Sequence, residues 1–567
     1  MSETPSTVAD MLPRMAAAQP DATAIYFPGK RRNGSVEYTP ISYRELDERS
    51  DRIAAGFAAV GIRRGDRAAL MVKPSPELFA LSFAMFKAGV VPVMIDPGLG
   101  VRGLAACLAR AQPSAFIGIP LAHAARIALG WGRATVKQLV WVGGLALGGH
   151  TLATVEARGA ERLRKGERPQ ATGPDEVAAI LFTSGSTGPP KGVVYRHRNF
   201  VAQVAAIRSM FGIEPGEIDL PTFPLFALFD PALGMTTVIP DMDASRPAAV
   251  DPRNIIEPIQ RFGVTTMFGS PALLNTVGRY AEREGVKLPS LRRVIAAGAP
   301  LPARTIARWH AMLDPAADVF PPYGATESLP VACMAGREIL GETWARTEAG
   351  AGVCVGAPVP DIDVRIIRID DEAIEQWSDD LLLPDGEIGE IAVRGPMVTE
   401  AYFNDEPNTQ KAKIPEREKR SEAQRREGRQ LRDGDRVWHR MGDLGWRDDR
   451  GRIWFCGRKA HRVPVGEQTL FTVDTEKVFD AHPQVFRSAL VGPSAGPTLC
   501  VELEPNTRKP WSEIEAELRA LAAEHPGLEL IRHFLPCNQR GGFPVDIRHN
   551  AKIGREQLRE WAEGQLR

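Results

Sequence analysis

The chain has 567 residues, of which 44% are hydrophobic and 25% charged, an ordinary balance for a globular protein long enough for two to four domains. Lys plus Arg and Asp plus Glu both number 70, so the formal net charge is zero. This balance argues against nucleic acid as a partner and against strong attraction to an anionic membrane.

The six cysteines are scattered without a CxxC pair, which argues against a zinc site or a disulfide framework and favours a reducing compartment. The first residues carry acids and no apolar core, so we predict no secretory signal. No apolar run approaches the length of a membrane span. We therefore predict a cytoplasmic protein without a membrane span.

The first 120 residues predict helices alternating with strands. Residues 1–35 suggest a helix and a short strand, and a long amphipathic helix follows, opened by Ser42 with Glu45 completing a capping box. Residues 67–118 repeat a strand–helix–strand pattern. Such spacing predicts parallel sheets covered by helices on both faces. These segments are interpreted as core and carry no predicted chemistry.

A loop rich in glycine and hydroxyl groups follows an apolar strand at residues 177–182. Glycines let a backbone turn tightly and point its N–H groups inward, and Lys191 adds a positive charge. The pattern suits a polyphosphate. It differs from the common P-loop, because Gly192 rather than Ser or Thr follows the lysine. The plain alternative is a Ser/Gly turn between strands. The candidate phosphate-binding residues of this loop, 183–192, are Thr183, Ser184, Gly185, Ser186, Thr187, Gly188 and Lys191.

The segment after the loop begins with a helix. Its basic cluster Arg196, His197 and Arg198 is interpreted as a solvated surface. Further on, Gly269 and Ser270 end a predicted strand, where an open α/β sheet usually places ligand contacts. These two residues are candidate substrate contacts.

A second motif, YGATE, covers residues 323–327. The face of Tyr323 can stack on adenine, Thr326 can donate to a phosphate, and Glu327 can hold Mg²⁺. Taken alone, the string could be a capped turn. Its position about 130 residues after the candidate phosphate loop favours the nucleotide interpretation.

The last third of the chain divides into three parts. Residues 386–404 predict a β-hairpin. Residues 405–436 form a charged, apolar-poor insertion that predicts a solvated loop or an exposed helix. Beyond Arg458, about 110 residues predict a small α+β domain.

In combination, these motifs resemble the adenylate-forming superfamily of acyl-CoA synthetases, peptide-synthetase adenylation domains and luciferases. The resemblance covers essentially the whole chain. It implies an α/β fold with a large N-terminal AMP-binding domain, residues 1–458, made of parallel and mixed sheets flanked by helices plus a β-barrel-like subdomain. It also implies a small mobile α+β C-terminal domain, residues 459–567. ATP and Mg²⁺ are the implied cosubstrate and metal.

The resemblance also assigns roles to residues at matching positions. Asp443 matches the aspartate that accepts from both ribose hydroxyls, and Arg458 the arginine beside the ribose. Lys552 matches the catalytic lysine that enters the active site during adenylation, with Thr187, Thr326 and Glu327 as further catalytic candidates. Phe226, with Phe229 close by, matches an aromatic residue bordering the acyl pocket. The remaining matches, to the segments that contact the nucleotide, are Gly298, Ala299, Pro300, Gly324 and Ala325.

Three departures from the superfamily concern the thioester step. Ala460 stands where thioester-forming members carry Asp or Lys at a domain hinge, the thiol-tunnel turn is unmatched, and the lysine motif reads RHNAK. The combination of YGATES followed by LPVA, the GRKAHRV segment and PVDIRHNAKI resembles the OleC branch, the β-lactone synthetases of bacterial long-chain olefin biosynthesis. That resemblance implies a long-chain 2-alkyl-3-hydroxy acid substrate without CoA. It makes other enzymes of an olefin-biosynthesis assembly candidate partners.

Three other functions are weighed against this hypothesis. A long-chain acyl-CoA or acyl-carrier-protein ligase would be favoured by an intact hinge and tunnel motif. A non-catalytic nucleotide-binding homologue predicts loss of Lys191, Glu327 or Lys552, and all three are present. A luciferase-like oxygenase has no positive feature in the sequence.

Overall fold

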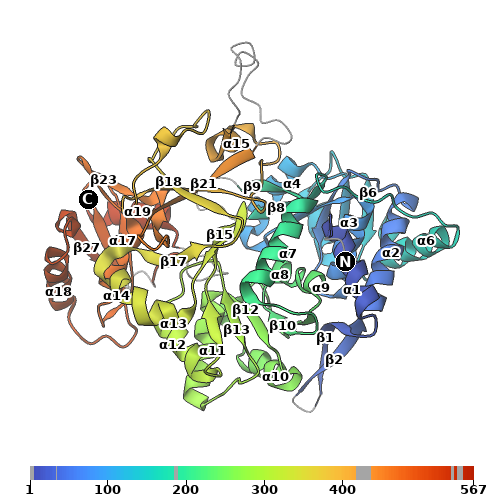
Figure 1. Cartoon of the computed structure of the whole chain (residues 1–567), viewed down its shortest axis with the longest axis horizontal. Coiled ribbons are helices and arrows are strands. Elements are labelled where there is room, and N and C mark those ends of the chain that lie inside the picture. The colour runs from blue at the N-terminus through green and yellow to red at the C-terminus, as the bar shows by residue number, and fades with distance from the viewer. Residues whose placement is uncertain (1–4, 33–34, 184–189, 417–435, 538–541, 546–552) are drawn as a thin grey trace, which may run out of the picture.

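The computed structural model describes residues 5–32, 35–183, 190–416, 436–537, 542–545 and 553–567. Two mainly parallel sheets and one antiparallel sheet make up most of the chain, and a smaller C-terminal part follows them. In Figure 1 the N-terminal sheet and its helices lie on the right, the second sheet lies in the lower centre, and the C-terminal part lies on the left.

The N-terminal sheet is parallel except at one edge, where its last two strands form an antiparallel hairpin. In spatial order its strands are β7 (His150–Thr151), β6 (Gln138–Trp141), β5 (Ala115–Gly118), β3 (Arg67–Met71), β4 (Val91–Ile95), β8 (Val177–Thr183) and β9 (Lys191–Arg196). Its connecting helices are α2 (Tyr43–Ala59), α3 (Pro76–Ala88), η2 (Pro97–Leu99), α4 (Gly100–Ala111), α5 (Pro120–Leu129) and α6 (Leu152–Arg164).

The second sheet is parallel apart from a terminal hairpin of its own. Its strands in order are β14 (Asp318–Phe320), β13 (Arg293–Ala296), β12 (Thr266–Gly269), β10 (Ile218–Pro221), β11 (Thr236–Val238), β1 (Thr23–Arg32) and β2 (Ser35–Ser42). The associated helices are η1 (Val8–Asp10), α1 (Met11–Ala18), α7 (His197–Phe211), α8 (Pro224–Ala227), α9 (Asp230–Leu233), η3 (Pro247–Ala249), α10 (Arg253–Phe262), α11 (Pro271–Glu284) and α12 (Ala303–Met312). The predicted α/β class is confirmed.

The third sheet is antiparallel, and one further strand, β20 (Lys413–Glu416), pairs with β21 (Arg436–Arg447), an inner strand of this sheet. Its strands in order are β15 (Tyr323–Ala325), β16 (Ser328–Cys333), β17 (Val353–Pro358), β22 (Ile453–Arg458), β21 (Arg436–Arg447), β19 (Gly389–Arg394) and β18 (Asp363–Ile367). The intervening helical turns are α13 (Gly336–Glu338), η4 (Ile339–Thr343), α14 (Trp344–Arg346), η5 (Thr347–Ala351), η6 (Asp379–Leu381) and α15 (Glu406–Ala412).

The C-terminal part has a small core of its own, centred on Phe479, Leu499 and Leu518, each fully buried. Its elements are η7 (Lys459–His461), β23 (Val463–Val465), β24 (Gln468–Leu470), α17 (Thr472–Asp480), β25 (Val485–Val491), β26 (Thr498–Leu503), α18 (Trp511–Ala523), η8 (Leu528–Leu530), β27 (His533–Pro536) and α19 (Arg555–Gln565). The division of the chain at residue 458 stays a prediction, which this separate core supports.

The start of α2 follows the predicted capping box. The Ser42 hydroxyl accepts from the Glu45 backbone N–H at 3.2 Å, and the Ser42 N–H donates to the Glu45 carboxylate at 2.7 Å. Both groups would otherwise lack a partner at a helix N-terminus, so the two side chains fix where the helix begins.

The prediction that residues 405–436 form a solvated loop or an exposed helix is wrong for the first residues of this segment. Residues 406–412 form α15, and β20 pairs with β21. Thr409, Lys413 and Ile414 are each at most 2% exposed, and the buried Asp405 pairs with Arg110. Low average hydrophobicity hid these residues, because the polar groups of Asp405 and Lys413 are satisfied by Arg110 and Thr399, which lie outside the segment. Residues 417–435 lie outside the described residues.

The basic cluster after β9 is also less exposed than predicted. His197 is 1% exposed, and burial lowers its pKa to about 4. Arg196 and Arg198 both form ion pairs with Glu400. The cluster therefore fixes the start of α7 against the segment that follows β19. Among the helices of the described residues, none is both long and apolar enough to cross a bilayer.

Candidate active site

A cavity of about 1580 Å³ lies where the three sheets and the C-terminal part meet. It lies at the carboxyl ends of β12 and β13, the usual position of ligands in open α/β sheets. Most of the described site residues predicted from the sequence line it. Those lining residues are Lys191, Phe226, Phe229, Ser270, Gly298, Ala299, Pro300, Tyr323, Gly324, Ala325, Thr326, Glu327, Asp443 and Arg458.

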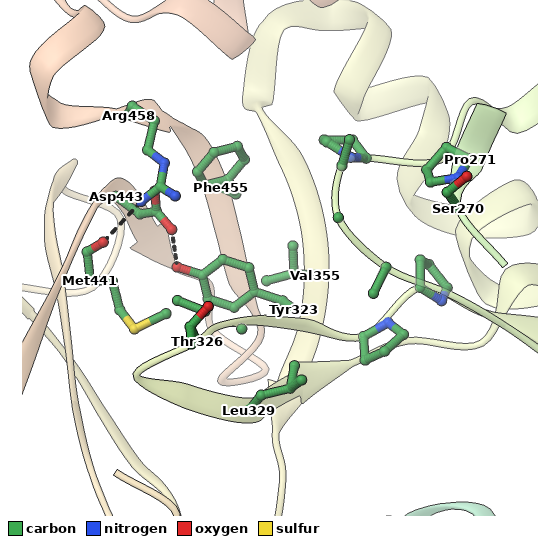
Figure 2. A pocket seen from close by; sticks show the side chains of 18 of the residues that line it. Ser270, Pro271, Tyr323, Thr326, Leu329, Val355, Met441, Asp443, Phe455 and Arg458 are labelled. Atoms are coloured by element: carbon green, nitrogen blue, oxygen red, sulfur yellow. Dashed lines mark hydrogen bonds and ion pairs between the residues drawn. The ribbon is translucent and has the colours of Figure 1, made fainter. Parts of the chain in front are cut away.

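One end of this cavity carries a triad of Tyr323, Asp443 and Arg458, joined by one hydrogen bond and one ion pair (Figure 2). The Tyr323 hydroxyl donates to Oδ2 of Asp443 at 2.7 Å, and Nη1 of Arg458 lies 3.0 Å from Oδ1. Asp443 and Arg458 are direct partners across β21 and β22, which explains why residues 15 positions apart meet. The same guanidinium donates to the Met441 carbonyl at 3.1 Å.

The charge of this triad is balanced inside the protein. Asp443 is 4% exposed, and its burial raises the pKa of the carboxyl above the ordinary value, while Arg458 opposes that rise. In return the Asp443 carboxylate raises the pKa of Arg458. A buried carboxylate with acceptor capacity is suited to hydroxyl groups such as those of a ribose. That role of Asp443 stays a prediction.

The YGATE segment is held by two tyrosines from distant elements. The Tyr195 hydroxyl on β9 donates to the Thr326 carbonyl. The Tyr402 hydroxyl donates to Oε1 of Glu327 at 2.5 Å. Thr399 donates to the Glu327 carbonyl from its N–H at 2.9 Å and from its hydroxyl at 3.1 Å. Sequence reasoning missed these three supporting residues, although Tyr402 lies in the β-rich block predicted at residues 386–404.

The hairpin of β8 and β9 brings the ends of the candidate phosphate loop together. Thr183 pairs with Lys191 across the two strands. The ammonium of Lys191 lies 5.2 Å from the ring centroid of Tyr402, a cation–π contact. The loop residues Ser184, Gly185, Ser186, Thr187 and Gly188 lie outside the described residues. Their roles stay predictions.

Of the predicted substrate contacts, Ser270 lies across the cavity from the triad in Figure 2, and Gly269 is not among the lining residues. Gly269 ends β12, as predicted. Ser270 caps α11, because its hydroxyl accepts from the Leu273 N–H at 3.3 Å. The ring of Phe226 stacks on Phe268, with centroids 4.2 Å apart. Ser270 therefore has a structural function besides any contact with substrate.

The C-terminal part reaches the same cavity through the segment after Lys552. Lys552 itself lies outside the described residues. Ile553 forms a bridge with Val545, and both line the cavity. Arg555 makes a two-pronged ion pair with Glu476 on α17, at 2.6 and 2.8 Å. This pair fixes Arg555 at the start of α19 against α17, and sequence reasoning missed Glu476.

A buried lysine lies behind the Glu327 segment. Lys413 is 1% exposed, and its ammonium donates to the carbonyl of Thr399, the residue that holds Glu327. Burial lowers the pKa of Lys413 to about 7. His439, which pairs with Lys413 on the neighbouring strand β21, also has a pKa well below the ordinary value because of burial.

Residues 12–403 match the family described as AMP-binding enzyme. The chain belongs to the AMP-binding enzyme family. A relative in Xanthomonas campestris, named olefin beta-lactone synthetase, is 52% identical and covers 98% of both chains. A relative of the same name in Stenotrophomonas maltophilia is 50% identical over 99% of both. The solved amide bond synthetase McbA from Marinactinospora thermotolerans shares the fold, with a TM-score of 0.73, 22% identity and coverage of 98% of this chain and 99% of that chain.

Proposed function

We propose that this AMP-binding enzyme activates a long-chain 2-alkyl-3-hydroxy acid with ATP and closes it to a β-lactone. The observation that carries the proposal is identity of about half, over nearly the full length, to relatives named olefin beta-lactone synthetase. The cavity supports it, because a polar nucleotide end at Tyr323, Asp443 and Arg458 continues into an apolar wall at Phe226 and Phe229.

The first step is adenylation. An oxygen of the substrate carboxylate attacks the α-phosphorus of ATP. The bond from this phosphorus to the oxygen bridging the β-phosphate breaks, and the products are acyl-AMP and pyrophosphate. Negative charge builds up on the phosphoryl oxygens during the attack. Lys191, Thr326 and Lys552 are the donors and cations that we assign to stabilise it. Asp443 and Arg458 hold the ribose end in place.

Glu327 fits a magnesium ion. Tyr402 donates to one of its carboxylate oxygens, which leaves acceptor capacity for a cation. The described residues contain no group of three or more His, Cys, Asp or Glu side chains that could hold a metal alone. Mg²⁺ in nucleotide sites is often bound by one or two carboxylates together with phosphates, which matches a single Glu327. Bound there, the ion would supply charge neutralisation at the phosphates.

The second step needs no thiol. The 3-hydroxyl oxygen attacks the acyl carbonyl carbon, the bond from that carbon to the AMP phosphate oxygen breaks, and the hydroxyl proton is released. The products are a four-membered lactone and AMP. Ala460 on η7 supports this proposal, because it offers only a methyl group at the hinge position, while its neighbours Lys459 and Arg462 form ion pairs with Glu390 and Asp371. CoA has no part in this scheme.

Mass spectrometry of the products tests the function. The purified enzyme receives a long-chain 2-alkyl-3-hydroxy acid, ATP and Mg²⁺, with and without CoA. We expect AMP, pyrophosphate and a neutral product lighter than the acid by one water, in equal yield in both reactions. A thioester as the main product would establish a long-chain acyl-CoA ligase instead. We further propose a cytoplasmic location, which agrees with the six free cysteines.

A further inference from the structure

The cavity extends past its nucleotide end between elements of the N-terminal core. We call this region the inner arm. It is lined by Val8, Phe86, Met94, Val204, Phe229 and Ala232. Apart from Phe229, these residues are each at most 7% exposed and belong to one packed core cluster. The walls of the inner arm are therefore apolar and belong to the packed interior of the protein.

A second extension, the outer arm, follows η3 and the first turns of α11. It is lined by Ala244, Pro247, Ala248, Phe268, Ala272 and Thr276. Asn275, Thr276 and Phe486 also line a neighbouring hollow of about 450 Å³. The walls of that hollow include the exposed Arg279 and Arg283. The outer arm therefore continues toward solvent, whereas the inner arm is walled by the packed interior.

Phe226 lies between the two arms. Its ring stacks on Phe268 of the outer arm with centroids 4.2 Å apart, and lies 6.4 Å from Phe229 of the inner arm. Phe229 in turn lies 6.3 Å from Phe200, which also lines the cavity. Phe226 therefore contacts a lining residue of each arm, Phe268 by stacking and Phe229 through a tilted ring contact.

We propose that the two arms bind the two alkyl chains of the substrate separately. The inner arm sets an upper limit on the length of one chain, and the outer arm accepts the other chain with little length limit. This assignment rests on the proposed function, because only a substrate with two chains needs both arms. Holding both chains fixes the torsion angle about the bond between C2 and C3. The 3-hydroxyl is thereby kept near the carbonyl carbon that it attacks.

The chain-length dependence of the wild-type enzyme tests the proposal. Two series of 2-alkyl-3-hydroxy acids vary one chain at a time, and kcat/KM for lactone formation is measured. Each buried methylene is expected to raise kcat/KM about fourfold until its arm is full. At one position, two further methylenes should then lower kcat/KM at least about tenfold, because a packed interior resists overfilling. At the other position, longer chains should change kcat/KM less than about threefold.

Matched variants assign the arms. Ala232→Leu should shorten the limit at the length-restricted position by about two or three carbons. Ala272→Leu, the same change in the outer arm, should leave that limit unchanged. It should instead lower kcat/KM for acids that are long at the other position. Val204→Ala should lengthen the limit, and thermal unfolding reports whether each variant folds.

The outcomes separate the two proposals. An equal length limit at both positions, or at neither, would overturn the assignment of the arms while lactone formation stands. An Ala232→Leu variant that folds and leaves both limits unchanged would also overturn it. If no acid of either series yields lactone, the proposed function itself fails.

Discussion

The Tyr402 hydroxyl donates to Oε1 of Glu327 at 2.5 Å, and Thr399 holds the carbonyl of the same glutamate. Glu327 is thus fixed at both its backbone and its side chain before any ligand binds. A carboxylate oriented in this way is suited to hold a cation at the phosphates of ATP.

Replacing Glu327 by Ala is expected to weaken Mg·ATP-dependent turnover strongly, by about a hundredfold or more, and to leave the fold intact. The measurement is the rate of pyrophosphate release at limiting and saturating Mg²⁺. Glu387→Ala, an exposed glutamate of the third-sheet region, serves as the control. A Glu327→Ala enzyme with full rate at limiting Mg²⁺ would show that this residue holds no metal.

Replacing Tyr402 by Phe removes one hydrogen bond to Glu327 but keeps the ring that faces Lys191. A hydrogen bond to a charged group contributes about 1.5–3 kcal/mol. We therefore expect the Mg²⁺ concentration for half-maximal rate to rise about tenfold, with a smaller loss at saturating Mg²⁺ than Glu327→Ala shows. An unchanged Mg²⁺ dependence would mean that Tyr402 does not position the carboxylate.

Lys552→Ala is expected to slow acyl-AMP formation at least about 10²–10³-fold, the usual loss for one preorganised donor to a developing anion. ATP binding should persist, because Tyr323, Asp443 and Arg458 belong to the large part of the chain. Pyrophosphate exchange and ATP titration measure the two effects separately, with Lys509→Ala as the control. Adenylate formation at near wild-type rate would contradict a role for the C-terminal part in this step.

The matching acid without its 3-hydroxyl should stop at a bound acyl-AMP, because no internal nucleophile is present to release it. Well-oriented intramolecular attack reaches effective molarities of about 10⁵–10⁸ M, so ring closure of the hydroxy acid needs no further nucleophile. Quenched single-turnover samples with CoA present would show adenylate and no thioester. Efficient acyl-CoA formation from the plain acid would reject the lactone proposal.

Lys413 gives a prediction for stability against pH. Burial lowers its pKa from 10.5 to about 7, so between these values the unfolded chain binds a proton that the folded chain does not. The free energy of unfolding therefore rises with pH across this window. Relative to Lys413→Met, the wild-type Tm should rise from about pH 7 to about pH 9 and level off below pH 7. Burial holds the pKa of the neighbouring His439 well below its ordinary value, so this residue is neutral across the window. A Tm difference that does not change with pH would contradict the shift.

Sequence alone determined the α/β class, the alternation of strands and helices, and the residues of the YGATE segment, because periodicity and turn chemistry are local properties. The capping box at Ser42 and the end of β12 at Gly269 are examples, since each depends on neighbours within a few positions. The family followed from motifs in a fixed order, which the comparisons confirm.

Only the tertiary structure decided which distant residues support the site. Tyr402 lies 75 positions from Glu327, and Glu476 lies 79 positions from Arg555, yet each pair is hydrogen-bonded. The burial of Lys413 was likewise hidden, because its partner Thr399 lies 14 positions away in the segment after β19 and its local composition is that of a solvated loop. The two arms of the cavity are also a product of the tertiary structure. Their walls join η1, α3 and α9 on one side with η3 and α11 on the other, and no local pattern records which apolar residues face a cavity and which fill the core.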